Sequence, residues 1–423
     1  MRYDQVGRKS RFRIICPGLL LSSVVLAEGD DKFGTFMLHT FAVSGYRSLK
    51  DNVLCLRQLN VVTGPNGSGK SSLYRALHMI SATANGRLIQ SLAREGGLQS
   101  TLWAGPERFS RQMLEGDVPV QGTVRKKPIS LRLGFSSCDF SYSIDLGLPS
   151  HRQTAFSLDP IIKRECLWRG PSRQARDLVA DRKANNLRIR PHRKWEDIKV
   201  PLSTSASMLT EFADPERGPE LILLRESIRS WRFYDHFRTD VDAPVRQVQI
   251  GTFTPVLSSE GDDLAAALQT IRESGHDESL HRAIRDAFPG SQLSIRNSGE
   301  ARFELFLSQD GMLRPLRSAE LSDGTLRFLL LAAALLTPQP PELMVLNEPE
   351  TSLHPDLLPA LGRLIIEYAQ HNQILVVTHA LPLIKTLTAN DQCEHFQLEK
   401  MFGATRLVGV DDFDLPNWEW PKR

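Results

Sequence analysis

The stretch that decides the fold is Gly64-Pro65-Asn66-Gly67-Ser68-Gly69-Lys70-Ser71, which fits the pattern GxxxxGK[ST] and is followed by Ser72. We call residues Gly64–Ser71 the phosphate loop. The residues before it, Leu59–Thr63, are apolar and β-branched, as in a short buried strand. A helix is predicted from Lys70 onward. A strand, this loop and a helix in that order form a binding site for nucleotide phosphates.

Each residue type in the phosphate loop has a physical role. Glycines let the main chain wrap closely round a phosphate and turn its N–H groups inward. The following helix adds the positive end of its dipole. Lys70 is predicted to reach the β- and γ-phosphates, and the Ser71 hydroxyl to bind Mg²⁺. The loop therefore predicts a site for ATP and Mg²⁺.

A second set of candidate residues lies about 280 positions further on. The apolar run Leu343–Leu346 predicts a buried strand, and Asn347-Glu348-Pro349-Glu350 follows it. In phosphate-loop enzymes such a strand delivers a metal-binding Asp, and the next acid activates water. Asn347 stands in place of the Asp and brings an amide oxygen without charge. Glu348 is the predicted general base.

Two segments flank this acidic strand. Glu320–Arg327 opens an apolar helix, with Ser322 at the expected N-cap and Gly324 where a close backbone approach is allowed. The start of that helix is a candidate second anion site. Further on, Ile374–His379 predicts another buried strand that ends in a lone histidine. The position of His379 on the strand after the acidic one favours a functional role.

In this order, GPNGSGKS, LSDGT, NEPETSLHP and VVTH resemble the ABC class of P-loop ATPases. They are most similar to the RecF/SMC-type heads and the AAA_21 group of predicted ATPases. The segment TFAVSGYRSLKD before the phosphate loop also resembles the first strands of RecF-like heads. The resemblance covers most of residues 37–410. It implies an α/β P-loop NTPase fold of the ABC/RecF-head type, split by an inserted mixed, mainly helical segment.

The resemblance also implies residue roles. The phosphate loop would be Walker A, and Leu343–Glu348 would be Walker B with Glu348 as the base. Leu321–Thr325 would be the signature segment, in which Ser322, Asp323 and Gly324 face a nucleotide held by a second copy. Ser352–Pro355 would be the D-loop, and His379 the switch histidine. For the Q-loop, which supplies a metal ligand, Gln90 and Gln99 are both candidates, and Gln99 fits better.

The composition of the chain excludes several other classes of protein. The chain has 423 residues, of which 41% are hydrophobic and 24% charged, with a net charge of +3. These values exclude global disorder, collagen and a disulfide-stapled mini-protein. Its five cysteines are scattered without a CxxC pair, so we expect reduced thiols and a cytoplasmic protein without a zinc site. Beyond residue 36 no run reaches about 18 uninterrupted apolar residues, so no membrane span is expected.

Four segments are expected along the chain. Residues 1–36 are either a signal-like extension or the result of a start assigned upstream of Met37, because basic residues precede an apolar run. Residues 37–165 and 256–423 would form the two parts of one ATPase domain, with a basic, helical insertion at 166–255. Between Lys163 and Lys199, twelve Lys or Arg residues stand against five acids. This stretch is either a solvated loop or a surface that binds DNA through its phosphates.

The function predicted from these features is that of a head-type ATPase. Nucleotide would drive its homodimerisation, and the dimer would act on DNA or on a DNA-processing partner, by analogy in repair or genome maintenance. A transporter's nucleotide-binding subunit is disfavoured by the RecF-like opening. A further alternative is a weakly hydrolysing, nucleotide-gated scaffold for a separate effector such as a defence nuclease. Asn347 is the feature that favours this alternative.

Overall fold

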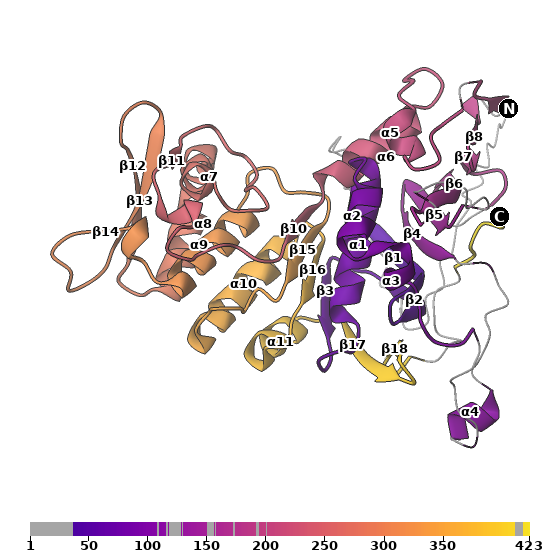
Figure 1. Cartoon of the computed structure of the whole chain (residues 1–423). Coiled ribbons are helices and arrows are strands. Elements are labelled where there is room, and N and C mark those ends of the chain that lie inside the picture. Colours follow the sequence, from indigo (N-terminus) through magenta and orange to yellow (C-terminus); the bar gives the residue numbers. More distant parts are fainter. Residues whose placement is uncertain are drawn as a thin grey trace, which may run out of the picture.

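The computed structural model describes residues 37–107, 110–115, 117, 128, 130–149, 156, 158–171, 174–191, 194–199, 201–410 and 418–423. The interpretations of residues 1–36 therefore lie outside the described residues. In the described part of the chain, a parallel sheet lies in the middle of the molecule, with an antiparallel sheet on one side and a smaller lobe on the other (Figure 1).

The central sheet has the strand order β10-β15-β16-β3-β17-β18, in which the first five strands are parallel and β18 is antiparallel. The strands predicted before the phosphate loop, before Asn347 and before His379 are β3, β15 and β16. The α/β fold expected from the sequence is thus confirmed. The six strands are β3 (Leu59–Thr63), β10 (Arg232–Tyr234), β15 (Met344–Asn347), β16 (Ile374–Val377), β17 (Cys393–Met401) and β18 (Ala404–Leu407).

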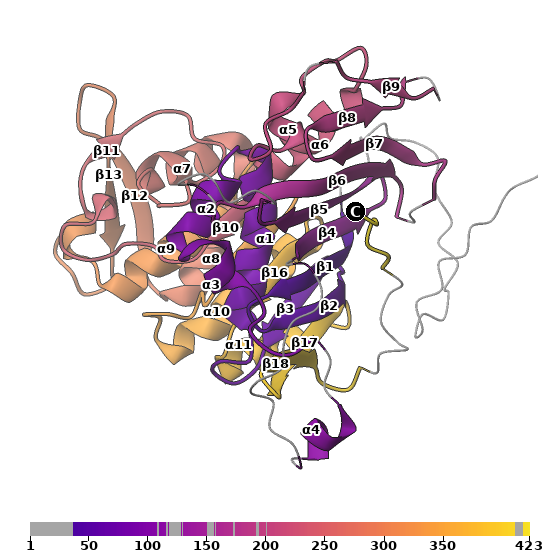
Figure 2. The same cartoon turned by 45° about the vertical axis from the view of Figure 1, so that its right-hand side comes forward.

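The second sheet is antiparallel, and its order β2-β1-β4-β5-β6-β7-β8-β9 follows the chain closely after β1 (Figure 2). Apolar side chains such as Phe41, Phe135 and Ile144 are almost fully buried on it. Its strands are β1 (Leu38–Tyr46), β2 (Leu49–Cys55), β4 (Leu131–Ser137), β5 (Phe140–Gly147), β6 (Ile161–Arg169), β7 (Leu178–Lys183), β8 (Asn186–Ile189) and β9 (Glu196–Asp197).

Helix α1 (Lys70–Ala84) lies between these two sheets and contacts β1 and β4 on one side and β15 and β16 on the other. The parallel strands alternate accordingly, because successive side chains point to opposite faces. Val62, Val345 and Val377 belong to the core that includes α1. The intervening side chains belong to a second core built with α9 (Asp323–Leu335) and α10 (Leu358–Ala369).

The smaller lobe is formed by the part of the chain between β10 and α9, together with the start of α9. Its sheet consists of β11 (Gln249–Ile250), β12 (Gln292–Asn297), β13 (Arg302–Ser308) and β14 (Leu316–Arg317), packed with α7 (Leu264–Ile271) and α8 (Asp277–Ala287). None of the helices in the described residues is both long enough and apolar enough to span a bilayer. The other helical segments are α2 (Leu88–Arg94), α3 (Gly97–Thr101), α4 (Arg111–Glu115), α5 (Met208–Glu211), α6 (Pro219–Ser230), α11 (Leu381–Thr388), η2 (Pro244–Arg246), η3 (Arg272–His276), η4 (Ser318–Glu320) and η5 (Pro355–Leu357).

Residues 166–255 differ from the expected helical insertion. The expected boundary at residue 165 falls inside β6, and β6 to β9 complete the antiparallel sheet, while β10 joins the parallel sheet. The helical elements among the described residues of this range are α5, α6 and η2. The sequence does not show the alternation of apolar and polar residues expected of these strands, because some buried positions carry charged side chains. Glu165 and Arg182 are both fully buried.

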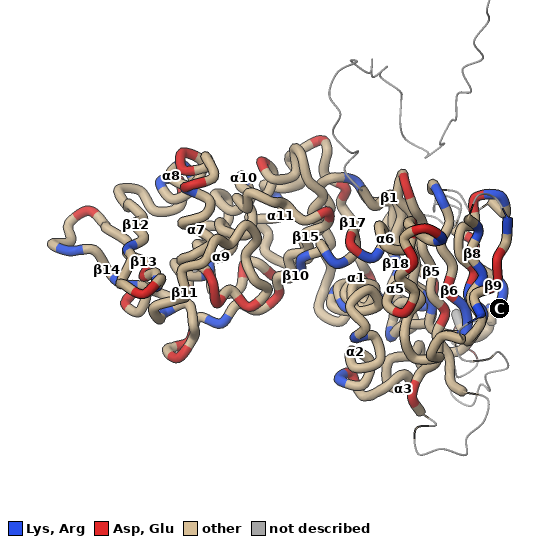
Figure 3. Tube along the Cα trace, turned by 90° about the horizontal axis from the view of Figure 1, so that it is seen from above, with Lys and Arg blue, Asp and Glu red and all other residues tan. Residues whose placement is uncertain are grey.

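The basic stretch Lys163–Lys199 is also less positive than its composition indicates. Arg164 and Arg188 both pair with Asp181, at 2.8 and 3.1 Å, and Arg169 pairs with Glu220. Figure 3 shows acidic and basic positions interleaved along β6 to β9. Several of the cations on which a DNA surface would depend are therefore neutralised within the sheet.

The pair Glu165–Arg182 yields a test of this sheet. Glu165 Oε2 lies 3.2 Å from Arg182 Nη1 and accepts a hydrogen bond from the Met208 amide at 2.9 Å. Glu165→Ala leaves a guanidinium buried without its counter-charge, so we expect the free energy of unfolding to fall by about 3–5 kcal/mol. Urea unfolding followed by circular dichroism measures this loss.

Glu196→Ala, an exposed position on β9 of the same sheet, is the matched control. We expect it to change the free energy of unfolding by less than about 0.5 kcal/mol. Equal urea midpoints for the two variants would contradict a structural role for the buried pair.

Candidate active site

One edge of the parallel sheet gathers the predicted site residues. The strands β15, β16 and β3 are neighbours and parallel, so their carboxyl ends lie at the same edge. The acidic turn (Asn347–Glu350) follows β15, the histidine turn (Thr378–Ala380) follows β16, and the phosphate loop follows β3. The topology therefore brings together segments that are about 280 residues apart in the sequence.

The phosphate loop takes backbone conformations that require glycine. Gly64 has φ 147°, and a Cβ atom there would lie 2.3 Å from the Leu398 carbonyl oxygen. Gly69 has φ 113°, and its Cβ would lie 2.2 Å from Thr405 Oγ1. Gly69 is also the N-cap of α1. The loop thus packs tightly against β17 and β18 and leads directly into the helix N-terminus.

Lys70, Ser71 and Ser72 form the first turn of α1. The Lys70 ammonium donates hydrogen bonds to the carbonyl oxygens of Gly64, at 2.6 Å, and Pro65, at 3.2 Å, and so lies over the loop. Ser71 is exposed, as are Pro65, Asn66 and Gly67 at the tip of the loop. Ser68 is buried, and its hydroxyl oxygen has no hydrogen-bond partner.

The acidic turn carries backbone strain at Glu348. Its φ is 47°, a left-handed conformation that costs a non-glycine residue on the order of 1–3 kcal/mol. Its main-chain N–H donates to the Val377 carbonyl oxygen at 2.8 Å, which ties the turn to β16. The side chain is 41% exposed. Strain of this kind concentrates at functional sites, and here it occurs at the predicted general base, which the hydrogen bond to Val377 holds at the sheet edge.

Glu350 joins the acidic turn to the histidine turn. One carboxylate oxygen, Oε1, accepts from the Thr378 hydroxyl at 2.7 Å and from the main-chain N–H groups of His379 at 2.8 Å and Ala380 at 3.2 Å. The other oxygen is buried without a hydrogen-bond partner. His379 Nδ1 lies 3.1 Å from Glu350 Oε1 and 4.0 Å from Glu348 Oε1. The side chain of Glu350 thus fixes where His379 stands relative to Glu348.

The signature segment lies against the D-loop, which follows the acidic turn. Ser322 caps α9 as predicted, because its hydroxyl oxygen accepts from the Thr325 N–H at 3.1 Å. Gly324 is close to the D-loop: a Cβ there would lie 2.9 Å from the Ser352 carbonyl oxygen. Asp323 pairs with Arg246 at 2.5 Å, so its charge at the start of the helix is balanced.

Arg327, on the same helix, is buried beside the acidic turn. Its Nη2 donates to the main-chain oxygen of Asp235 at 3.0 Å and lies 3.5 Å from that of Glu348. Burial lowers the pKa of Arg327, while Asp235 and Glu350 raise it. The signature helix is thus connected by one guanidinium to the backbone that carries the predicted base.

Sequence reasoning missed four residues at this site: Asp235, Arg246, Arg327 and Glu350. Glu350 lay within the motif that drew attention but received no role. Asp235 follows a three-residue strand, β10, and its side chain accepts a hydrogen bond from Asn347 Nδ2 at 2.7 Å. The signal that could have found it is the run Trp231–Tyr234, which is largely apolar and is followed by an acid, as β15 is.

The residues present fit a magnesium ion bound together with a nucleotide. The Ser71 hydroxyl and the Asn347 amide offer oxygen ligands, and Asn347 Oδ1 is buried without a hydrogen-bond partner. In the described residues no group of three or more His, Cys, Asp or Glu side chains could hold a metal alone. Gln99 and Gln90, the expected Q-loop candidates, are exposed on α3 and α2 and not on a strand of the parallel sheet.

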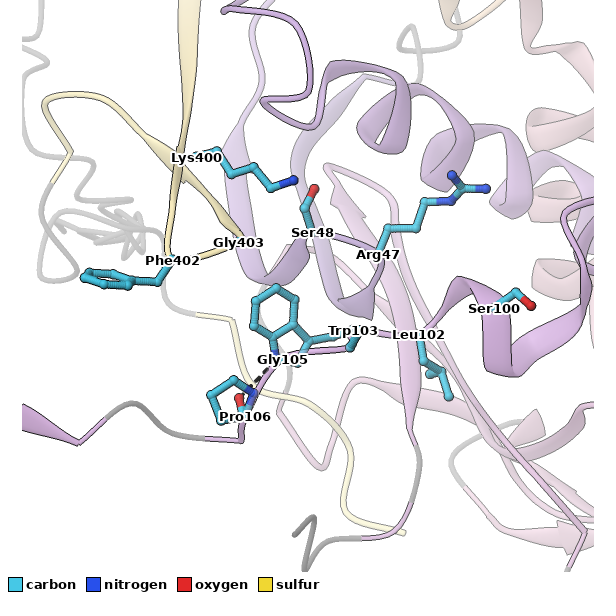
Figure 4. A pocket seen from close by; sticks show the side chains of 11 residues that line it. Arg47, Ser48, Ser100, Leu102, Trp103, Gly105, Pro106, Lys400, Phe402 and Gly403 are labelled. Atoms are coloured by element: carbon cyan, nitrogen blue, oxygen red, sulfur yellow. Dashed lines mark hydrogen bonds between the residues drawn. The ribbon is translucent and has the colours of Figure 1, made fainter. Parts of the chain in front are cut away.

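A pocket of about 570 Å³ lies beside the phosphate loop, lined among others by Arg47, Trp103, Lys400 and Phe402 (Figure 4). It is connected to the loop through Ser48, another lining residue. Thr405 Oγ1 lies 2.8 Å from Ser48 Oγ and 2.7 Å from the Ser68 carbonyl oxygen. The pocket combines aromatic rings with cationic side chains.

Among solved structures, an SMC head bound to the C-winged helix domain of ScpA is 12% identical with a TM-score of 0.47, and covers 89% of this chain and 99% of its own. The SMC head domain from Thermotoga maritima is 16% identical with a TM-score of 0.41, with the same coverages. An SMC head from Pyrococcus furiosus with an extended coiled coil is 12% identical with a TM-score of 0.45, covering 88% and 96%.

No curated protein matches the chain. The model of the AAA_21 family, described as "AAA domain, putative AbiEii toxin, Type IV TA system", matches residues 59–384. That range begins at β3 and ends within α11, so it includes the phosphate loop, the signature segment and the acidic and histidine turns. The chain belongs to the AAA_21 family, and the resemblance to P-loop ATPases indicated by its motifs is confirmed.

Proposed function

We propose that this protein binds ATP with Mg²⁺ at the phosphate loop and hydrolyses it with Glu348 as the general base. The observation that carries the proposal is the meeting of three segments at one sheet edge: the phosphate loop, the acidic turn and the histidine turn. The pocket lined by Trp103 and Arg47 next to the loop supports it, because rings and cations suit the planar base of a nucleotide.

In this proposal the side chains and main-chain groups of the protein have separate roles in the reaction. Lys70 and the N–H groups at the start of α1 bind the β- and γ-phosphates and stabilise the charge that grows on them. Glu348 accepts a proton from the attacking water, whose oxygen forms the new bond to the γ-phosphorus as the bond to the ADP oxygen breaks. His379, held by Glu350, orients the γ-phosphate. Bound Mg²⁺ supplies charge neutralisation between the phosphates.

The proposal extends to a homodimer in which the signature segment of one copy meets the nucleotide of the other. Ser322 and Gly324 stand at the start of a helix of 13 residues, where main-chain N–H groups favour an anion. Arg246 neutralises Asp323, which would otherwise repel a phosphate. Closure and opening of this dimer in the cytoplasm would act on DNA or on a DNA-processing partner.

A second candidate function is a nucleotide-gated scaffold that hydrolyses ATP slowly and holds a separate effector. Asn347 favours it, because this side chain brings no charge to the metal. The paired arginines on β6 to β9 also favour a protein partner over direct DNA binding. The two candidates differ in turnover, and the following experiment separates them.

Steady-state phosphate release by the full chain, with and without duplex DNA, tests the ATPase proposal. We expect Lys70→Ala to abolish ATP binding, because it removes the cation over the loop. Glu348→Gln should retain binding and lose about 10²–10⁴-fold in turnover, because it removes the proton acceptor. ATP binding with equal, near-zero turnover in wild type and Glu348→Gln would favour the scaffold.

Glu350→Gln tests the link between the two turns. We expect the turnover number to fall on the order of 10²-fold with little change in KM for ATP, because Glu350 positions His379 without touching nucleotide. Initial-rate kinetics over a range of ATP concentrations give both constants. Glu399→Gln, an exposed position on β17, is the matched control and should leave both unchanged. A rise in KM alone would contradict a positioning role.

A further inference from the structure

The position of Asp235 follows from the register of two strands. Strands β10 and β15 are parallel, and Tyr234 pairs with Leu346. The next pair in this register is Asp235 and Asn347, and the hydrogen bond from Asn347 Nδ2 to Asp235 Oδ1 at 2.7 Å joins them. The carboxylate that is absent from position 347 is therefore present one strand away, at the same edge of the sheet.

Both side chains lie on the face of the sheet that carries the nucleotide-binding helix. Phe233 and Val345, two residues earlier on each strand, belong to the core built with α1. Because side chains alternate along a strand, Asp235 and Asn347 lie on that face too. The Phe233 ring is 5.9 Å from that of Tyr74, which is on α1 one turn after Ser71. The pKa of Tyr74 is raised by burial and then by the negative charge of Asp235.

The orientation of the Asn347 amide leaves one atom without a partner. Its nitrogen is used by Asp235, and its oxygen, which has lone pairs for two bonds, is buried and unpaired. Buried acceptors are nearly always satisfied in folded proteins, so an unpaired one calls for a donor or a cation. A magnesium ion with its bound waters would satisfy it, and Mg²⁺ prefers such oxygen atoms.

The backbone at Asp235 is also held in place. Arg327 donates from Nη2 to the Asp235 carbonyl oxygen at 3.0 Å, and the same guanidinium reaches towards the main chain of Glu348. A carboxylate on a clamped backbone is preorganised for a ligand, because little conformational freedom is lost when the ligand binds. Asp235, Asn347 and Glu348 are thus held as one unit by a residue of the signature helix.

We propose that Asp235 supplies to the nucleotide-bound Mg²⁺ the carboxylate that Asn347 lacks. This inference rests on the proposed function, since it concerns the metal at the same site. In this arrangement Asp235 provides the negative charge at the metal, and Asn347 is the uncharged residue beside it. The sequence motif indicates the reverse, with the charge at position 347. Moving the charge back to position 347 should therefore restore what its removal from position 235 takes away.

The test uses the full chain and a fluorescent ATP analogue titrated with Mg²⁺. Asp235→Asn keeps an oxygen that can accept from Asn347 but removes the charge. Mg²⁺ is expected to tighten binding of the analogue. We expect Asp235→Asn to raise the Mg²⁺ concentration at which this effect is half-maximal by about 10–100-fold. Binding in EDTA should be unchanged. The double variant Asp235→Asn/Asn347→Asp should return the Mg²⁺ requirement to the wild-type value.

Asp391→Asn, the same chemical change on an exposed residue after α11, is the matched control and should change nothing. An unchanged Mg²⁺ requirement in Asp235→Asn would overturn the inference while the ATPase proposal stands. A double variant as impaired as Asp235→Asn would overturn it too. Failure of the wild type to bind the analogue under any condition would instead overturn the proposed function.

A measurement on the unaltered protein covers the case in which Asp235→Asn does not fold, which thermal melting without nucleotide reveals. Fe²⁺ replaces Mg²⁺ in the presence of a non-hydrolysable ATP analogue, and peroxide with ascorbate then cleaves the chain close to the metal. We expect cuts near Ser71, Asp235 and Asn347 that excess Mg²⁺ suppresses. Cuts near Ser71 and Asn347 without one near Asp235 would overturn the inference.

Discussion

The burial of α1 between two sheets is the constraint on which the rest of this structure depends. Leu77 and Ile80 on this helix are completely buried, and the helix contacts strands of both sheets. The phosphate loop is the segment that starts the helix, so it cannot move independently of either sheet. Its glycines are needed for the same reason: the chain must turn from β3 into a helix that has no freedom to shift.

From this constraint follows the position of every other part of the site. The parallel strands beside β3 must end at the edge where α1 begins, so their turns face the loop. The signature helix packs on the opposite face of the same sheet, and its buried Arg327 reaches the main-chain oxygen of Glu348 in the acidic turn. The start of α9 is thus joined to the backbone of Glu348 through a buried side chain of the same helix.

The sequence predicted those features that depend on local pattern. The loop, its flanking strand and helix, and the N-cap at Ser322 each follow from residues within one short segment. Asp235, the neighbour of Asn347, could not be predicted in this way. It follows β10, which has only three residues, and the order of strands in a sheet is decided by packing between distant segments. Gln99 was favoured as the Q-loop residue because the stretch Arg94–Ser100 fitted better than that around Gln90, and the structure has it on α3. The end of β6 and all of β7 were assigned to a basic insertion at 166–255, because the sequence does not show that Glu165, Asp181 and Arg182 pair with other charges inside the sheet.

The contact between Thr405 and the phosphate loop has a consequence for biosynthesis. Thr405 bonds to the Ser68 carbonyl oxygen across 337 positions of the chain, and Leu38 bonds to Gln373 across 335. Contacts of such long sequence separation form late, and the chain leaves the ribosome from its N-terminus. A nascent chain therefore exposes the loop well before the hairpin that supports it has been made. The loop gains the support of Thr405 only when translation has passed β18.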